Sequence, residues 1–222
     1  MEIRRKKDAR PTYGEGLKVL VGPKEVPFFV HEGPVRVSSK FFDNAMKGPW
    51  TEAAERCVRL RDDEPDVFSI YHDWLYTRML STAHDVGGVE GNQEYIDLCK
   101  AYCLGESLMD DNFKNAAIDA IIHKNLTPAS DRQRWYPVGM AIRHAYDGTP
   151  PGSPLRKLLV DFYSKHARVS WFSDYTSKDE MPKDFLYEVT LALVTVRSRT
   201  DDRDAWENPV QVKSLYHSQT KT

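Results

Sequence analysis

A few residues have types and spacings that could support acid–base chemistry. Tyr71, His72 and Asp73 are consecutive, but neighbours on a helix point in different directions, so they are not expected to form a proton relay. His31 follows an expected strand, where a lone histidine is more often a hydrogen-bonded packing residue than a catalyst. The chain has no Gly-x-Ser-x-Gly motif for a hydrolase nucleophile. The sequence therefore predicts no catalytic residue and no enzymatic activity.

Cysteines, glycines and a run of acids are the remaining candidates for ligand chemistry. Cys99 and Cys103 are four residues apart on an expected helix, but no second pair follows at zinc-site spacing, which favours small buried thiols. The glycine-rich residues 87–91 lack the Lys-Ser or Lys-Thr of a phosphate-binding loop. Acids at 62–64 precede a proline, as is typical of a helix N-terminus. No metal and no cofactor are expected, and a hydrolase or metalloenzyme built from these groups is kept only as a third hypothesis.

Composition limits the classes of partner. The 222 residues include 41% hydrophobic residues and carry a net charge of -2, so a buried core is expected and a broad basic surface for nucleic acid is not. No run approaches the roughly 18 apolar residues of a membrane span. Three cysteines, an odd number, favour a reducing, intracellular compartment, either nucleus or cytoplasm. The basic residues 4–7 could be a nuclear address, although such a run at a terminus is usually solvated.

The elements expected first are a β-hairpin and two helices. Strand-forming residues at 17–21 and 28–30 flank the turn residues 22–25. Apolar spacing then predicts a helix that ends at Gly48-Pro49, a third strand at 57–60, and a helix opened by Asp62 to Pro65. That second helix has a wide apolar stripe, which predicts a central place in the core: Val67, Phe68, Ile70, Tyr71, Trp74 and Leu75.

Beyond residue 80 the pattern is helical. A surface loop is expected at 81–92, followed by two amphipathic helices with a break near Gly105. Trp135, Val138 and Ile142 are placed on one further helix. Ser153 is expected to cap the next, with Pro154 at its first position. The last helix carries Phe185, Val189, Ala192, Leu193 and Val196.

The order of these elements and several short motifs resemble the BTB/POZ fold, most closely the single-domain BTB proteins of fungi. The motifs are Val19-Leu20-Val21-Gly22, Phe28-Phe29-Val30-His31, Ser38 with Phe41-Phe42, Trp50-Thr51-Glu52-Ala53, Leu60 with Asp63 to Phe68, Trp74 to Thr77, Leu98 to Leu108, Asn115 to Asp119, and Thr149 to Arg156 with Leu158 to Asp161. The resemblance implies an α+β (mixed α/β) fold, with a small sheet flanked by a cluster of helices and followed by an all-α extension.

The expected organisation has four parts. Residues 1–15 form a flexible leader, 16–125 the BTB/POZ domain, 126–198 a helical extension and 199–222 a polar tail. In long-form relatives a segment before the core exchanges between subunits. The leader here is short and rich in breakers, so a homo-oligomer stays open but a strand-swapped dimer is not expected.

The resemblance implies a protein–protein interaction module. Such domains recruit partners, and many bind cullin ubiquitin ligases as adaptors through a hydrophobic residue followed, two positions later, by Glu in a loop. Trp50 and Glu52 fit that pattern, and with Met46 of the preceding helix they are the candidate partner-binding residues. The alternative is a structural or self-associating protein that binds no cullin.

Overall fold

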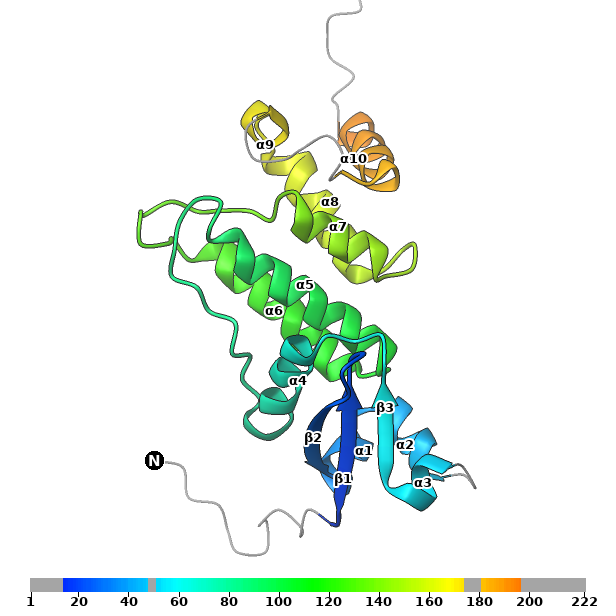
Figure 1. The fold of residues 1–222 in the computed structure, drawn as a ribbon. Coiled ribbons are helices and arrows are strands. Elements are labelled where there is room, and N and C mark those ends of the chain that lie inside the picture. The colour runs from blue at the N-terminus through cyan, green and yellow to red at the C-terminus, as the bar shows by residue number, and fades with distance from the viewer. Residues whose placement is uncertain (1–13, 48–50, 174–180, 197–222) are drawn as a thin grey trace, which may run out of the picture.

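The computed structural model describes residues 14–47, 51–173 and 181–196. It is an α+β protein with one small sheet and many helices (Figure 1). The order of elements is β1 (Gly16–Val21), β2 (Val26–His31), α1 (Glu32–Ser38), α2 (Lys40–Lys47), α3 (Thr51–Glu55), β3 (Cys57–Leu60), α4 (Pro65–Thr77), α5 (Asn92–Ser107), α6 (Asp111–Leu126), α7 (Met140–Asp147), α8 (Pro154–His166), α9 (Val169–Ser173) and α10 (Lys183–Val196).

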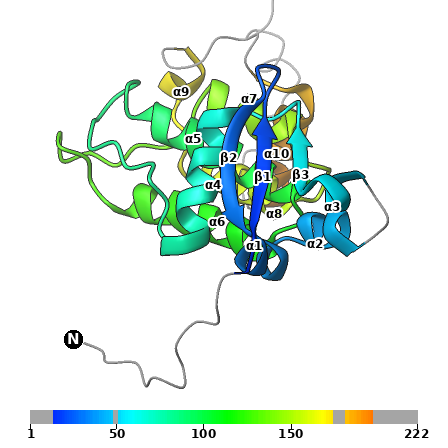
Figure 2. The ribbon, with the colours of Figure 1, turned by 60° about the horizontal axis from the view of Figure 1, so that its bottom comes forward.

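The sheet has the strand order β2-β1-β3. The predicted hairpin is confirmed, since β1 and β2 pair antiparallel, and β3 then pairs parallel to β1. Gly22 begins the turn with a φ of 75°, which favours glycine. Figure 2 shows the strands in front of the helices. On the face away from the first core, Lys18, Phe29 and Arg59 are exposed.

The first core lies between this sheet and the helices α1, α2, α4, α5 and α6. The expectation that the helix after Pro65 is central is confirmed. Five of its side chains are buried: Val67, Phe68, Tyr71, Trp74 and Leu75. The ring of Phe113 from α6 packs edge-on against Tyr71 at 4.9 Å between ring centroids. Aromatic packing therefore joins α4 to the α5–α6 pair.

The predicted break near Gly105 is wrong by a few residues. Gly105 is buried inside α5, which continues to Ser107. A Cβ atom at Gly105 would lie 2.7 Å from Cγ of Lys114, so the glycine allows α5 and α6 to approach closely. The chain turns instead at Leu108 to Asp110, where Asp110 caps α6.

A second core joins α5 and α6 to the helices that follow, α7 to α10. Two details differ from expectation. Trp135 and Val138 lie in the irregular segment before α7, where Trp135 Nε1 donates to Asp131 and the Val138 N–H donates to Asn92. Ser153 precedes α8, but its hydroxyl lies 3.5 Å from Tyr102 Oη and makes no cap hydrogen bond.

Three short helices, α1, α3 and α9, were not expected from the sequence. Each has seven residues or fewer, too few to show an apolar period. In the part of the chain that the structure describes, no helix has the length and apolar character needed to cross a membrane.

Candidate partner-binding surface

The three predicted partner-binding residues lie in or near two neighbouring helices. Met46 is in α2, where it is half-buried and packs against the first core. Glu52 is in the first turn of α3 and is also half-buried, so the loop expected there is a helix. Trp50 lies outside the described residues. Helices α2 and α3 are in contact, which places Met46 and Glu52 on adjoining elements.

We call the part of α2 and α3 that carries Met46 and Glu52 the α2–α3 surface. A network of charged side chains connects the elements behind it. Glu32 of α1 accepts hydrogen bonds from Arg36 at 2.6 Å and from Arg56 at 2.7 Å. Arg36 also donates to Asp43 of α2 at 3.1 Å, and Asp43 pairs in turn with Lys47. These contacts connect α1, α2 and the start of β3.

Arg56 belongs to this network and has an unusual backbone conformation. Arg56 joins α3 to β3 with a φ of 52°, a conformation that is uncommon for a residue with a side chain. Its guanidinium holds that turn in place by donating to the Gly16 carbonyl at 3.2 Å and by pairing with Glu15 at 3.1 Å. The α3 helix is therefore tied to the start of β1.

The guanidinium groups of Arg36 and Arg56 hold the pKa of Glu32 below its usual range. We expect Glu32→Gln to lower the free energy of unfolding at pH 7 by about 0.5 to 1 kcal/mol. Because the folded-state pKa is the lower one, the contribution is complete above the unfolded value of about 4.3 and disappears as the pH falls through the folded-state pKa.

Urea denaturation at pH 7 and at pH 3 measures this difference. The exposed Glu90, changed to Gln, is the matched control and should have no effect at either pH. An equal loss for Glu32→Gln at both pH values would show that the ion pairs do not act as described.

The candidate acid–base residues are separated by the fold. His31 is hydrogen-bonded, as expected, with its backbone N–H and Nδ1 within 2.8 and 3.0 Å of Tyr76 Oη, although the residue is exposed rather than packed. Tyr71 is buried and donates to Asp110 at 3.1 Å. His72 Nδ1 lies 3.8 Å from Asp73, too far for a hydrogen bond. The structure therefore does not bring Tyr71, His72 and Asp73 into one relay.

Cys99 and Cys103 lie in the second core and at its edge. Cys99 is fully buried, and burial raises the pKa of its thiol. Burial also raises the pKa of the half-buried Cys103 to about 12. Both thiols therefore stay protonated near neutral pH. Within residues 14–47, 51–173 and 181–196, no three His, Cys, Asp or Glu side chains are grouped as metal ligands.

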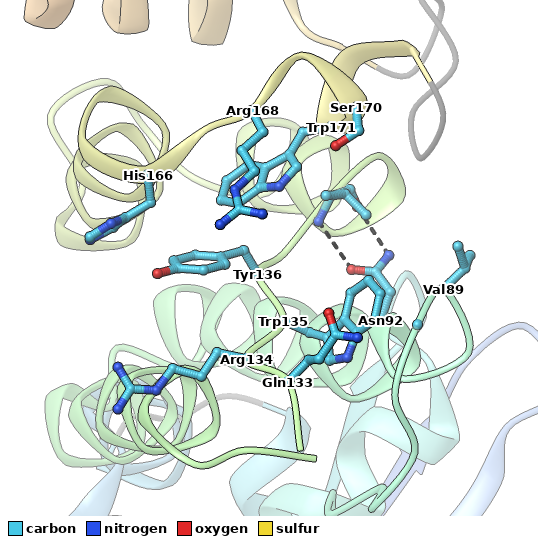
Figure 3. Close-up of a pocket in the computed structure, with 12 residues that line it drawn as sticks. Val89, Asn92, Gln133, Arg134, Trp135, Tyr136, His166, Arg168, Ser170 and Trp171 are labelled. Carbon is cyan, nitrogen blue, oxygen red and sulfur yellow. Dashed lines mark hydrogen bonds between the residues drawn. The ribbon is translucent and has the colours of Figure 1, made fainter. Parts of the chain in front are cut away.

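A pocket beside the glycine-rich loop was not foreseen from the sequence. It has a volume of about 440 Å³ and lies between the segment before α5, the segment before α7 and the α8–α9 junction (Figure 3). Asn92 holds the segment before α7 at one wall of the pocket. Its side-chain oxygen accepts from the N–H of Val138, and its side-chain nitrogen donates to the carbonyl of Val138. The pocket is lined by Gly88, Val89, Asn92, Gln133, Arg134, Trp135, Tyr136, Val138, His166, Arg168, Ser170 and Trp171.

The glycine-rich loop packs beside this pocket. A Cβ atom at Gly87 would lie 2.2 Å from a carboxylate oxygen of Asp131, and one at Gly91 would lie 2.1 Å from the Val86 carbonyl oxygen. Asp131 also accepts from Trp135 Nε1 at 2.8 Å. Because Gly87 and Gly91 have no Cβ atom, the loop can lie close to Asp131 and can fold back on Val86, and it forms one rim of the pocket.

No protein-family model matches this sequence, and no curated protein matches it significantly. The structure defines the class of protein as α+β with a small sheet and helices.

Proposed function

We propose that this chain is a non-catalytic protein-binding module of the BTB/POZ type, an adaptor or scaffold that recruits a partner to a cullin-type ubiquitin ligase. The observation that carries the proposal is the adjacency of α2 and α3, which places Met46 and Glu52 on adjoining helices. An apolar side chain beside a carboxylate is a suitable contact for a helical partner with apolar and basic groups.

The charged contacts behind Met46 and Glu52 support this proposal. Binding has a lower entropy cost when the contacting residues are already ordered. The hydrogen bonds from Arg36 and Arg56 to Glu32 join α1 to β3, and Asp43 extends the network to α2. The same surface is thus held by charged contacts behind it and by the first core, against which Met46 packs.

The second candidate function is self-association without cullin binding. Phe29 is 67% exposed on β2, which is an edge strand of the sheet. Edge strands with exposed apolar side chains are common sites of pairing between chains, although Pro27 lowers the number of backbone donors on this one. This surface differs from the α2–α3 surface, so the two candidates can be tested separately.

Isothermal titration of the purified chain with the N-terminal region of a cullin tests the first candidate. We expect Glu52→Lys, Met46→Ala and Trp50→Ala each to weaken binding by about tenfold or more, which corresponds to about 1.4 kcal/mol. The matched controls are Glu90→Lys and Met79→Ala, both at exposed positions on other segments. If Glu52→Lys and Trp50→Ala bind the cullin as well as the parent chain does, the proposed surface is wrong.

A further inference from the structure

We propose a second binding site, independent of the α2–α3 surface: the 440 Å³ pocket between residues 88–92, 133–138 and 166–171 binds an acidic peptide that carries an aromatic side chain. The pocket combines cationic residues at its rim with aromatic residues further in. Arg134, Arg168 and His166 are exposed, whereas Trp135 and Tyr136 are half-buried. No lining residue is acidic.

The two arginines are available for a ligand. Among the described residues, no carboxylate lies within ion-pair distance of Arg134 or Arg168, although many other basic side chains of the chain are paired. Guanidinium groups bind carboxylates with two parallel hydrogen bonds, which gives direction as well as charge complementarity. The rim of the pocket therefore favours a ligand with carboxylates.

The aromatic residues form the wall against which a planar or apolar side chain can pack. The ring centroids of Tyr136 and Trp171 lie 4.6 Å apart, and His166 lies 5.4 Å from Tyr136. In Figure 3 Arg168 points toward Tyr136, and Arg134 lies on the other side of that ring. A ligand that places carboxylates on both arginines would thus have its middle over the tyrosine.

Peptide is favoured over nucleic acid by charge. A nucleic-acid binder needs a long basic track, whereas the chain has a net charge of -2 and the lining of this pocket includes only two arginines and one histidine. Such a peptide has two sources. It can belong to another protein, or to this chain, whose C-terminal residues 201–207 carry this chemistry: Asp201, Asp202, Asp204, Trp206 and Glu207.

Fluorescence anisotropy with a labelled peptide of residues 200–208 tests the proposal on the full chain. We expect binding that Arg134→Ala and Arg168→Ala each weaken by about fivefold or more, and the double variant by about thirtyfold. Lys157→Ala, an exposed lysine on α8 outside the pocket, should bind as the parent does. A peptide whose acids are replaced by Asn and Gln should bind at least about tenfold more weakly.

A second experiment distinguishes the tail of this chain from a separate protein as the source of the peptide. In the full chain with Asp201→Asn, Asp202→Asn and Asp204→Asn, the tail has fewer carboxylates with which to compete against the labelled peptide for the pocket. If this variant binds the labelled peptide more tightly than the parent does, the chain's own tail occupies the pocket. Unchanged affinity supports a separate protein as the source.

Three results would overturn the proposal. The first is that neither the parent nor the tail variant binds the labelled peptide. The second is that the double arginine variant, with an unchanged circular dichroism spectrum, binds as the parent does. The third is that a single-stranded oligouridylate of equal charge binds this pocket more tightly than the peptide.

Discussion

Replacing Asp110 by alanine is expected to lower the free energy of unfolding by about 3 kcal/mol. Asp110 is completely buried, and its carboxylate accepts three hydrogen bonds. They come from Ser38 at 2.5 Å, from Tyr71 at 3.1 Å and from the backbone N–H of Phe113 at 3.0 Å. The alanine variant loses the cap of α6 and leaves the buried Tyr71 hydroxyl without this acceptor.

The isosteric variant Asp110→Asn is the control for this prediction. Its side-chain oxygen can still cap α6, and its amide can donate to hydroxyl groups that turn to accept. We expect less than half of the loss seen for alanine. Urea denaturation followed by circular dichroism measures both values, and an alanine variant within about 1 kcal/mol of the parent would contradict the role assigned to Asp110.

Arg156 is the second residue whose removal should have a large effect. It is buried on α8, and Nε donates to Thr149 Oγ1 at 3.0 Å. Its terminal nitrogen donates to the carbonyls of Tyr146, at 2.8 Å, and Thr149. The cation therefore satisfies carbonyl groups at the C-terminal end of α7, where the helix dipole favours positive charge.

Arg156→Ala is expected to lower the free energy of unfolding by about 3 kcal/mol, because buried carbonyls lose their donor and a cavity opens. Arg156→Lys keeps the charge but not the planar fork, so it should lose less than the alanine variant. The exposed neighbour Lys157, changed to Ala, should alter stability by less than about 0.5 kcal/mol. Equal stability of Arg156→Ala and Lys157→Ala in thermal denaturation would refute this account.

The sequence allowed good prediction where apolar residues repeat with a clear period. The hairpin, the strand at Cys57–Leu60 and the helix after Pro65 are all confirmed. In each case alternation or a helical stripe matches the side that the structure buries. Turn residues such as Gly22 then set the boundaries correctly.

Segments stabilised by distant contacts were harder to predict. Trp135 and Val138 have helical spacing with Ile142, yet they lie in an irregular segment where Trp135 bonds Asp131 and its carbonyl accepts from Tyr95. The spacing of apolar residues does not distinguish a helix from a loop that neighbouring elements bury. Gly105 was interpreted as a break because a close helix–helix approach is not visible in one segment of sequence.

The two candidate sites also differ in how far the sequence could predict them. The α2–α3 surface was predicted because Met46, Trp50 and Glu52 lie within a few residues of one another and match a family pattern. The pocket was not predicted, because it gathers residues from three separate segments, 88–92, 133–138 and 166–171. The signal available in the sequence was the alternation of Arg134 and Arg168 with nearby aromatic residues.

The proposed adaptor role requires that this chain binds a cullin. Light scattering of the 25.6 kDa chain, alone and mixed with the N-terminal region of a cullin, measures whether the two form a complex. We expect the mixture to contain a species whose mass is the sum of the chain and the cullin fragment, and we expect Glu52→Lys to remove this species. A mixture that contains only the separate cullin fragment and multiples of the chain's own mass would contradict the claim and support self-association.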